Sequence, residues 1–315
     1  MNYSSNSPAI ILMGPSAAGK TAISLELARK YPVEIISVDS AMVFKGMDIG
    51  SCKPTLEEQK MAPHHLLDIL EPDQNFNAGI FLDHVEQALT IITKNNKVPL
   101  FVGGSMMFYK LLLDGMHDFP SDLAVRTEIE LTRSKKGDEA LIKELELLDP
   151  ETFRVIDLKN PRRVARALEI IKITNTKLSQ LKRRPKESLL NKKNCLLLGI
   201  SGSKEELDLK AALRIEKILN AGFLIELEKL VTTYKLNSNS HSMNSINYKQ
   251  FLSYLEGKIS LEEAKKDALS ATRKLIKTQR TWMKKFQLNY VKIASDENDS
   301  KYFSDTINTY LRSYK

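Results

Sequence analysis

Short apolar runs alternate with amphipathic stretches over the first hundred residues of the chain and again near residue 200. Four of these runs have the length and composition of parallel strands that are buried on both faces. They are residues 9–13, 33–38, 98–104 and 195–200. We therefore predict a sheet of at least these strands.

Hydrophobic residues at helical spacing fill much of the sequence between the strands. The helical stretches are residues 20–30, 81–93, 205–231 and a basic final helix after residue 264. Strands that alternate with helices predict an α/β fold with a doubly wound parallel sheet. Ligands of such folds bind at the C-terminal ends of the strands.

The pattern changes over residues 119–193, which show almost no strand character and are punctuated by turn signals. This segment holds 18 Lys and Arg against 12 Asp and Glu, and so carries +6 of the net charge of +8. Its basic runs are residues 160–166 and 181–186. We predict an α/β core of residues 1–118 and 194–315 with a mostly helical, basic insertion domain over residues 119–193.

Composition limits the class of protein. The chain is 42% hydrophobic and 27% charged, which suits a globular core, and no apolar run approaches the length of a membrane span. The N-terminus lacks the features of a secretory signal, and two cysteines make neither a disulfide framework nor a metal pattern. We expect a cytoplasmic monomer without membrane contact. The pI of about 9.2 suggests a polyanionic partner.

The sequence "GPSAAGKT" matches G-x-x-x-x-G-K-[ST] between the first strand and the first helix, which makes it a phosphate-binding P-loop. Backbone N–H groups and the helix N-terminus bind oxyanions, the lysine reaches terminal phosphate oxygens, and the Thr21 hydroxyl suits Mg²⁺. The residues of this predicted diphosphate or nucleotide site are Gly14, Pro15, Ser16, Ala17, Ala18, Gly19, Lys20 and Thr21.

Two further side chains follow predicted strands and so fall on the same sheet edge. Asp39 ends the second strand; it suits a Mg²⁺ ligand or a general base, and the plain alternative is a turn or helix-capping aspartate. Ser105 follows a Gly-Gly pair that permits close ligand approach, and a helix-capping role is the alternative for it. The phosphate loop, Asp39 and Ser105 together point to one site.

Other candidates carry weaker signals. Arg162 and Arg166 share a helix face from which Arg163 turns away, and a solvated basic face is the default interpretation. His64 and His65 are adjacent and lack partners at ligand spacing, so we expect structural roles. The residues alone leave a P-loop small-molecule kinase or ATPase, or a non-catalytic RNA-binding protein, as alternatives. The basic insertion favours an enzyme with a nucleic-acid substrate.

Seven segments, in order and spacing, resemble the bacterial tRNA dimethylallyltransferases. They are "GPSAAGKT", "EIISVDSAMVFKGMDIGSCKP", "APHHLLDI", "VPLFVGGSMMFYKLLLDG", "NPRRVARALEI", "SINYKQFLSYLEG" and "ATRKLIKTQRTW". The resemblance covers about residues 8–285 and implies transfer of a dimethylallyl group from dimethylallyl diphosphate to N6 of adenosine 37 of tRNA, beside the anticodon, with Mg²⁺. The phosphates in the loop would then be a leaving diphosphate.

The resemblance also implies roles for individual residues. Asp39, Ser105 and Arg126 match catalytic positions, with Asp39 acting on the adenine amine and Ser105 standing where the family usually has Thr. The residues that match tRNA-contacting positions are Asp39, Ser40, Ala41, Met42, Arg162, Arg163, Val164, Ala165, Arg166, Asn244, Ser245, Ile246, Asn247, Tyr248 and Lys249. The insertion would grip the anticodon stem-loop through its phosphates.

Three departures from the family pattern concern affinity more than the reaction. Asn247 stands where the family usually has Gly, and Asn is the residue next most tolerant of positive φ, so we expect the turn to persist. Thr278 replaces a common basic residue and removes one potential phosphate contact. Ser16 and Ala17 replace the commoner residues of the loop.

Overall fold

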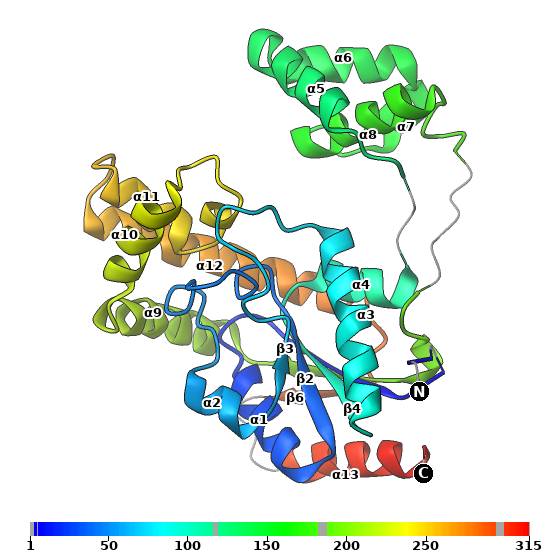
Figure 1. The fold of residues 1–315 in the computed structure, drawn as a ribbon, viewed down its shortest axis with the longest axis vertical. Coiled ribbons are helices and arrows are strands. Elements are labelled where there is room, and N and C mark those ends of the chain that lie inside the picture. Colours follow the sequence, from blue (N-terminus) through cyan, green and yellow to red (C-terminus); the bar gives the residue numbers. More distant parts are fainter. Residues whose placement is uncertain (1–2, 5, 116–118, 182–187, 294–298, 315) are drawn as a thin grey trace. The chain divides into compact units, whose positions relative to one another are not determined.

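The computed structural model describes residues 3–4, 6–115, 119–181, 188–293 and 299–314. The chain divides into two compact units (Figure 1). The core unit is formed by Met1–Leu113 with Ser188–Lys315, and the insertion unit by Asp114–Glu187. We had predicted the insertion over residues 119–193. Of its second basic run, residues 182–186 lie outside the described residues.

The core unit is built on a six-stranded, fully parallel sheet with the order β3-β2-β4-β1-β5-β6. The strands are β1 (Ala9–Met13), β2 (Val33–Val38), β3 (His64–His65), β4 (Val98–Gly103), β5 (Cys195–Ser201) and β6 (Tyr290–Ile293). The α/β class and the four central strands are as predicted. The sequence analysis missed the two edge strands: β3 has only two residues, and β6 follows a basic helix without an apolar run.

The central strands are mostly apolar because both faces of the sheet are covered; the buried polar exceptions are Glu34 and Ser37 of β2. Ile11 and Met13 of β1 pack into one hydrophobic cluster, while Ile10 and Leu12 pack into the cluster on the opposite face. Helices supply the other half of each cluster, as parallel sheets require. The core-unit helices are α1 (Lys20–Lys30), α2 (Leu56–Met61), α3 (Ala78–Lys94), α4 (Met106–Asp114), α9 (Lys204–Asn220), α10 (Phe223–Tyr234), α11 (Tyr248–Leu255), α12 (Leu261–Met283), α13 (Asp299–Arg312), and the 3₁₀ turns η1 (Lys192–Asn194) and η2 (Ser242–Asn244).

One predicted helix was wrong in extent. The stretch 205–231 forms two helices, α9 and α10, because the chain turns at Gly222, whose φ is 95°. Glycine adopts that conformation without steric cost, and hydrophobic periodicity does not register the break. No helix in the described ranges combines the length and apolar character that crossing a bilayer needs.

The insertion unit consists of α5 (Leu123–Lys136), α6 (Asp138–Leu148), α7 (Pro150–Val155) and α8 (Pro161–Thr174) around a separate small core. Asp122, Asp149 and Asn160 cap three of these helices through their side chains. In the core unit, the Leu190 N–H donates to the Leu112 carbonyl over 3.1 Å, so the chain leaves and re-enters this unit at neighbouring points.

Candidate active site

The phosphate loop joins β1 to α1. A Cβ at Gly14 would stand 2.9 Å from the Ile200 carbonyl oxygen, so the loop passes β5 too closely for a side chain. Gly19 precedes α1 with φ of 84° and provides no side-chain cap. The first N–H groups of a helix have no intrahelical partners. In the described part of the chain, those of Gly19, Lys20 and Thr21 have no protein partner, so they are free to bind an oxyanion.

Lys20 is the first residue of α1, and its side chain folds back over the loop. Its ammonium donates to the carbonyl oxygens of Gly14 (3.0 Å) and Pro15 (2.8 Å). Burial, with a smaller contribution from the positive charge of Arg214, lowers the pKa of Lys20 to about 8, although the negative charge of Asp39 acts in the opposite direction. Two cations this close to one another, one of them desolvated, favour an anion between them.

Asp39 ends β2 and uses one carboxylate oxygen to hold the turn that follows. Its Oδ1 accepts from the N–H groups of Ala41 (2.7 Å) and Met42 (3.2 Å). The turn alternative is therefore realised, although no helix begins here. For Oδ2 the described residues offer no hydrogen-bond donor, so this oxygen remains available to a ligand.

Ser105 follows β4, where two glycines are needed for different reasons. A Cβ at Gly103 would stand 2.0 Å from the Val38 carbonyl oxygen, and one at Gly104 would stand 2.3 Å from Nε2 of Gln279 on α12. The ends of β2 and β4 are thereby brought together, and the Ser105 N–H lies 3.4 Å from the Val38 carbonyl oxygen.

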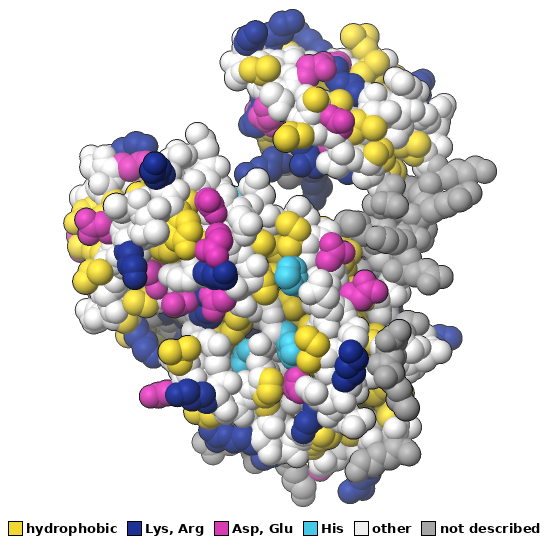
Figure 2. Space-filling model, in the orientation of Figure 1, with side chains coloured by type: hydrophobic (Ala, Val, Ile, Leu, Met, Phe, Trp, Pro, Cys, Tyr) yellow, Lys and Arg dark blue, Asp and Glu magenta, His cyan; other side chains and the backbone are white. Residues whose placement is uncertain are grey.

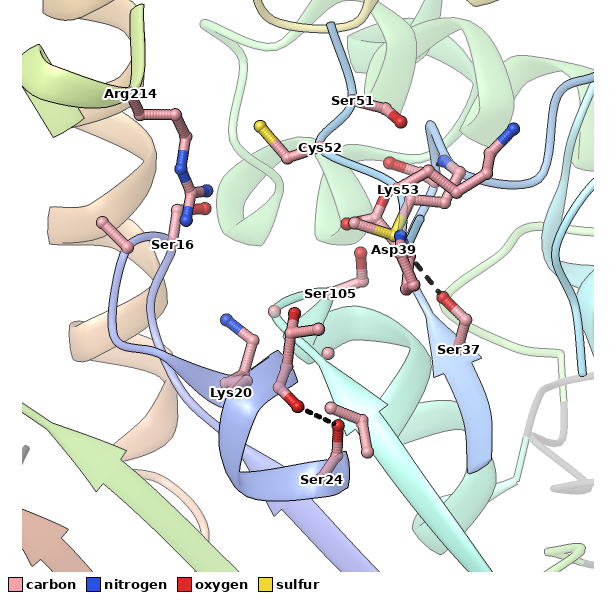
Figure 3. A pocket seen from close by; sticks show the side chains of 18 of the residues that line it. Ser16, Lys20, Ser24, Ser37, Asp39, Ser51, Cys52, Lys53, Ser105 and Arg214 are labelled. Carbon is pink, nitrogen blue, oxygen red and sulfur yellow. Dashed lines mark hydrogen bonds between the residues drawn. The ribbon is translucent and has the colours of Figure 1, made fainter. Parts of the chain in front are cut away.

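These groups line one cavity of about 1220 Å³. Figure 3 shows Lys20, Ser105, Asp39 and Arg214 around the same open space. Arg214 was missed in the sequence analysis, together with Lys210 and Lys217 of the same helix, which also line the cavity. Their spacing of four and three residues places them on one face of α9, but a basic helix face has no signal of its own that distinguishes a site from a solvated surface.

Comparison with known proteins bears on what this cavity does. The sequence model of a family described as IPP transferase matches residues 42–286. The tRNA dimethylallyltransferase of Thiobacillus denitrificans is 38% identical over 88% of both chains, and that of Francisella philomiragia is 38% identical over 92% of this chain and 94% of its own. A crystal structure of a tRNA isopentenylpyrophosphate transferase from Staphylococcus epidermidis is 32% identical, with a TM-score of 0.68, and covers 98% of this chain and 100% of that one.

This chain belongs to the tRNA dimethylallyltransferase family. It is therefore an enzyme that transfers a prenyl group to an adenosine of tRNA. Family membership decides against the kinase and the non-catalytic alternatives. The expected family resemblance is confirmed, whereas the roles of single residues stay predictions.

The segment after Asp39 forms the cavity wall opposite the phosphate loop, and polar contacts hold it in place. The Glu226 carboxylate accepts from the N–H groups of residues 48–50 at 2.7 to 3.1 Å and from the Tyr248 hydroxyl at 2.6 Å. The Lys53 ammonium donates to the Phe44 carbonyl oxygen (2.9 Å) and forms ion pairs with Asp48 and Asp68, both at 2.5 Å.

Asn247 keeps the turn that glycine usually makes at this position, as predicted, with φ of 73°. It also adds a contact that glycine lacks, because its Nδ2 donates to the Gly50 carbonyl oxygen over 2.8 Å. Its buried Oδ1 has no partner among the described residues. Of its neighbours, Asn244 and Lys249 are exposed, Ser245 and Ile246 are half-buried, and Tyr248 is buried, so Tyr248 offers no surface to tRNA.

The arginines predicted in the insertion unit differ in what they contact. Arg126 donates to the Glu169 carboxylate (2.9 Å), and Arg166 forms a second ion pair with it (2.7 Å). Arg166 also donates to the carbonyl oxygens of Phe119 and Pro120, both at 3.0 Å. These two arginines thus anchor the start of the unit through one buried carboxylate.

Arg162 and Arg163, at the start of α8, are exposed, as are Arg126 and Arg154 elsewhere in the unit. Figure 2 shows Lys and Arg side chains over the surface of the unit. Ala165 is half-buried. Val164 is only 1% exposed and belongs to the core of the unit, so its side chain is not available to tRNA. Fewer side chains are therefore available to tRNA in this stretch than the five predicted over residues 162–166.

Metal ligands are sparse at the site. In the described ranges no three His, Cys, Asp or Glu side chains are placed to hold a metal ion. His65 pairs with Glu34 at 2.8 Å, and His64 contacts the Ala62 carbonyl oxygen at 2.8 Å, in line with the structural roles expected for them. Burial lowers the pKa of His64.

Proposed function

We propose that this enzyme transfers the dimethylallyl group of dimethylallyl diphosphate to N6 of adenosine 37, next to the anticodon of its tRNA. The supporting observation is that the phosphate loop, the Lys20 and Arg214 cations, and Asp39 with Ser105 line one cavity. Transfer forms a bond between N6 and C1 of the allyl group and breaks the bond from C1 to the diphosphate oxygen. The electron pair of that bond leaves with the diphosphate.

The loop side serves the leaving group. The N–H groups of Gly19, Lys20 and Thr21 bind diphosphate oxygens, while Lys20 and Arg214 neutralise the charge that develops as the bond breaks. An allylic carbon tolerates partial positive charge, so stabilising the leaving group lowers the barrier most directly. An anion bound beside Lys20 raises its low pKa again, because the negative charge favours the ammonium form.

The opposite side serves the acceptor. Asp39 holds its turn with Oδ1 and accepts the N6 proton with Oδ2, which makes it the general base. Ser105 stands beside the same space and orients the amine through its hydroxyl. The target base must leave the anticodon-loop stack to reach this depth.

The protein oxygens at this site suit a Mg²⁺ ion that takes most of its ligands from the substrate. The Thr21 residue lines the cavity, and its hydroxyl has no partner among the described residues. Mg²⁺ is commonly held by one or two protein oxygens together with phosphates and waters. Such an ion would supply further neutralisation of the diphosphate. Thr21 is the residue we assign to it.

We also assign the tRNA-binding surface. Arg162 and Arg163 of the insertion unit contact phosphates of the anticodon stem-loop, since they are exposed cations on a unit rich in them. Ser40, Ala41 and Met42 in the turn after Asp39 meet the loop near the target base. Arg126, which the family resemblance matches to a catalytic position, shares the Glu169 carboxylate with Arg166, and together they support this surface by anchoring the start of the unit.

The test uses purified enzyme, Mg²⁺ and tRNA that lacks the modification. Dimethylallyl diphosphate is offered in one reaction and ATP in another, and the digested tRNA is analysed by mass spectrometry. We expect N6-dimethylallyladenosine at position 37 in the first reaction alone. Absence of this nucleoside with dimethylallyl diphosphate, or its appearance at another position, would overturn the proposal.

A further inference from the structure

A single glutamine joins the two sides of the cavity. Gln279 lies on α12, and its residue is 6% exposed. Its Oε1 accepts from the Ser16 N–H at 2.8 Å, and its Nε2 donates to the Gly104 carbonyl oxygen at 3.0 Å. One planar amide therefore links the phosphate loop to the end of β4.

The two linked segments belong to the two halves of the proposed reaction. Ser16 belongs to the loop that holds the diphosphate, and Gly104 precedes Ser105 on the acceptor side. The backbone joins the two segments where they leave the sheet, because β1 pairs with β4 and the Gly14 N–H donates to the Gly103 carbonyl oxygen over 3.4 Å. Gln279 adds a side-chain link beyond that point and so holds Ser16 relative to the residue before Ser105.

The fit between Gln279 and Gly104 is close enough to exclude a side chain. A Cβ at Gly104 would stand 2.3 Å from Nε2 of Gln279. The same amide occupies the Ser16 N–H, which is thereby withdrawn from anion binding. The diphosphate is left with the N–H groups at the helix start, from Gly19 to Thr21.

We propose that Gln279 is a positioning residue, which fixes the phosphate loop relative to Ser105 so that C1 of the donor meets the acceptor amine. This rests on the proposed function. Displacing reacting groups by about 1 Å is enough to cost about 100-fold in rate. Both polar atoms of the Gln279 amide are engaged by the Ser16 N–H and the Gly104 carbonyl oxygen, so its loss should displace these segments and slow the transfer step far more than it weakens tRNA binding.

The first variant is Gln279→Met, which keeps the volume of the side chain and removes both hydrogen bonds. The matched control is Thr281→Ala, at an exposed position on the same helix outside the cavity lining. Single-turnover rates are measured with saturating donor and tRNA, alongside the melting temperature and the Kd values for tRNA and inorganic diphosphate. We expect Gln279→Met to slow transfer by about 30-fold or more and to weaken diphosphate binding, with tRNA affinity and melting temperature close to those of the control.

A double-mutant cycle tests the contact itself. Gly104→Ala should slow transfer because the new Cβ displaces the Gln279 amide. In the Gln279→Ala background, where there is room for a methyl group, the same change should cost much less. Additive effects would overturn the proposal, as would a wild-type rate in Gln279→Met or equal losses in rate, tRNA affinity and melting temperature.

The failure of the proposed function is distinguishable from these outcomes. If the wild-type enzyme formed no dimethylallyladenosine, the proposed function would be wrong. The role of Gln279 would then be tested by measuring the affinity for inorganic diphosphate in the four proteins of the same double-mutant cycle. A non-additive effect of the two changes on that affinity would support it. Unchanged or additive diphosphate affinities in that cycle would overturn it.

Discussion

At the scale of single residues, the Asp39 carboxylate divides its two oxygens between structure and chemistry. Oδ1 holds the backbone turn of residues 41–42, and Oδ2 is free of protein donors among the described residues. An amide at this position keeps the acceptor that closes the turn and loses the base. Asp39→Asn therefore separates the two tasks better than a truncation does.

We expect Asp39→Asn to lower kcat by about 100-fold or more, the usual contribution of a general base. The Kd for tRNA should stay within about threefold, because the turn that lines the acceptor side persists. Single-turnover kinetics and filter binding on the same preparation measure both quantities. Equal losses in rate and affinity would show that Asp39 acts only by holding the turn.

Lys20 makes diphosphate binding depend on pH. Its pKa of about 8 in the free protein means that the ammonium is present below pH 8 and lost above it. Inorganic diphosphate binds the charged form of Lys20 and raises its pKa, so the Kd for diphosphate should rise up to tenfold per pH unit above pH 8.

Calorimetry between pH 7.5 and 9.5 measures this dependence of the diphosphate Kd on pH. Lys20→Met should bind weakly and show no such slope; an identical slope in the variant would assign it to another group.

How far the sequence predicts a site residue depends on whether its role is local. Lys20 follows from a motif whose geometry is contained in eight consecutive residues. Arg214 and Gln279 reach the same cavity from helices about 190 and 260 positions further along the chain, and their own neighbours in sequence carry no trace of that contact. Only the packing of α9 and α12 reveals them.

At the scale of elements, the sequence pattern predicts those helices and strands whose burial leaves a periodic signature, and misses those whose position depends on one residue or on a sheet edge. The four central strands were predictable because burial on both faces makes them predominantly apolar, whereas β3 and β6 lie at the sheet edges and lack that signature. The break between α9 and α10 depends on one left-handed glycine in an otherwise periodic stretch. Burial also divides α8, whose Val164 faces the core while Arg162 and Arg163 face outwards.

The exposed start of α8 should contribute to the salt dependence of tRNA binding. Each phosphate contact adds close to one unit to the slope of log Kd against log salt concentration. Arg163→Ala should therefore weaken tRNA binding and reduce the slope by about one. Arg154→Ala removes the same charge from an exposed position on α7 and should leave the slope unchanged. Identical slopes for Arg163→Ala and the wild type would remove Arg163 from the interface.

The insertion unit should also lose stability in acid through one carboxylate. Burial opposes ionisation of Asp149, but hydrogen bonds from Thr152 and Ser179 outweigh it and lower the pKa from 3.8 to about 2. Because the folded pKa lies below the unfolded value, the stabilisation is complete above about pH 4 and is lost as the pH falls towards 2. It amounts to about 2 kcal/mol.

Urea unfolding of the full chain at several pH values between 7 and 3 tests this expectation. Asp149→Asn should lower the free energy of unfolding by about 2 kcal/mol at pH 7, and the gap from wild type should shrink below pH 4. Asp157→Asn changes an exposed carboxylate of the same unit and is the control. A gap that is constant with pH would mean that Asp149 acts through packing alone.

At the scale of the whole molecule, the anion-binding cavity and the arginines of α8 belong to different units. The cavity described above is lined entirely by residues of the core unit. The insertion unit, residues 114–187, holds 16 Lys and Arg against 14 Asp and Glu, which is +2 of the net charge of +8. The +6 of residues 119–193 therefore depends on bounds that leave out Asp114 and Asp118 and include two lysines of the core unit. The proposed division of labour is that the core holds the donor and the insertion holds the tRNA.

That division can be tested by removing the insertion, because the chain leaves and re-enters the core at adjacent points. The hydrogen bond between the Leu190 N–H and the Leu112 carbonyl brings the two ends together, so a short Gly-Ser linker is long enough to replace residues 114–188. Each unit has its own hydrophobic core, so the deletion opens no buried cluster of the core unit.

The shortened chain should keep its affinity for inorganic diphosphate within about threefold, since the loop, Lys20 and Arg214 remain. Its tRNA affinity should fall by about 100-fold or more as phosphate contacts are lost. Retained tRNA affinity would place the tRNA-binding surface in the core unit, and loss of both affinities would show that the units depend on one another for folding.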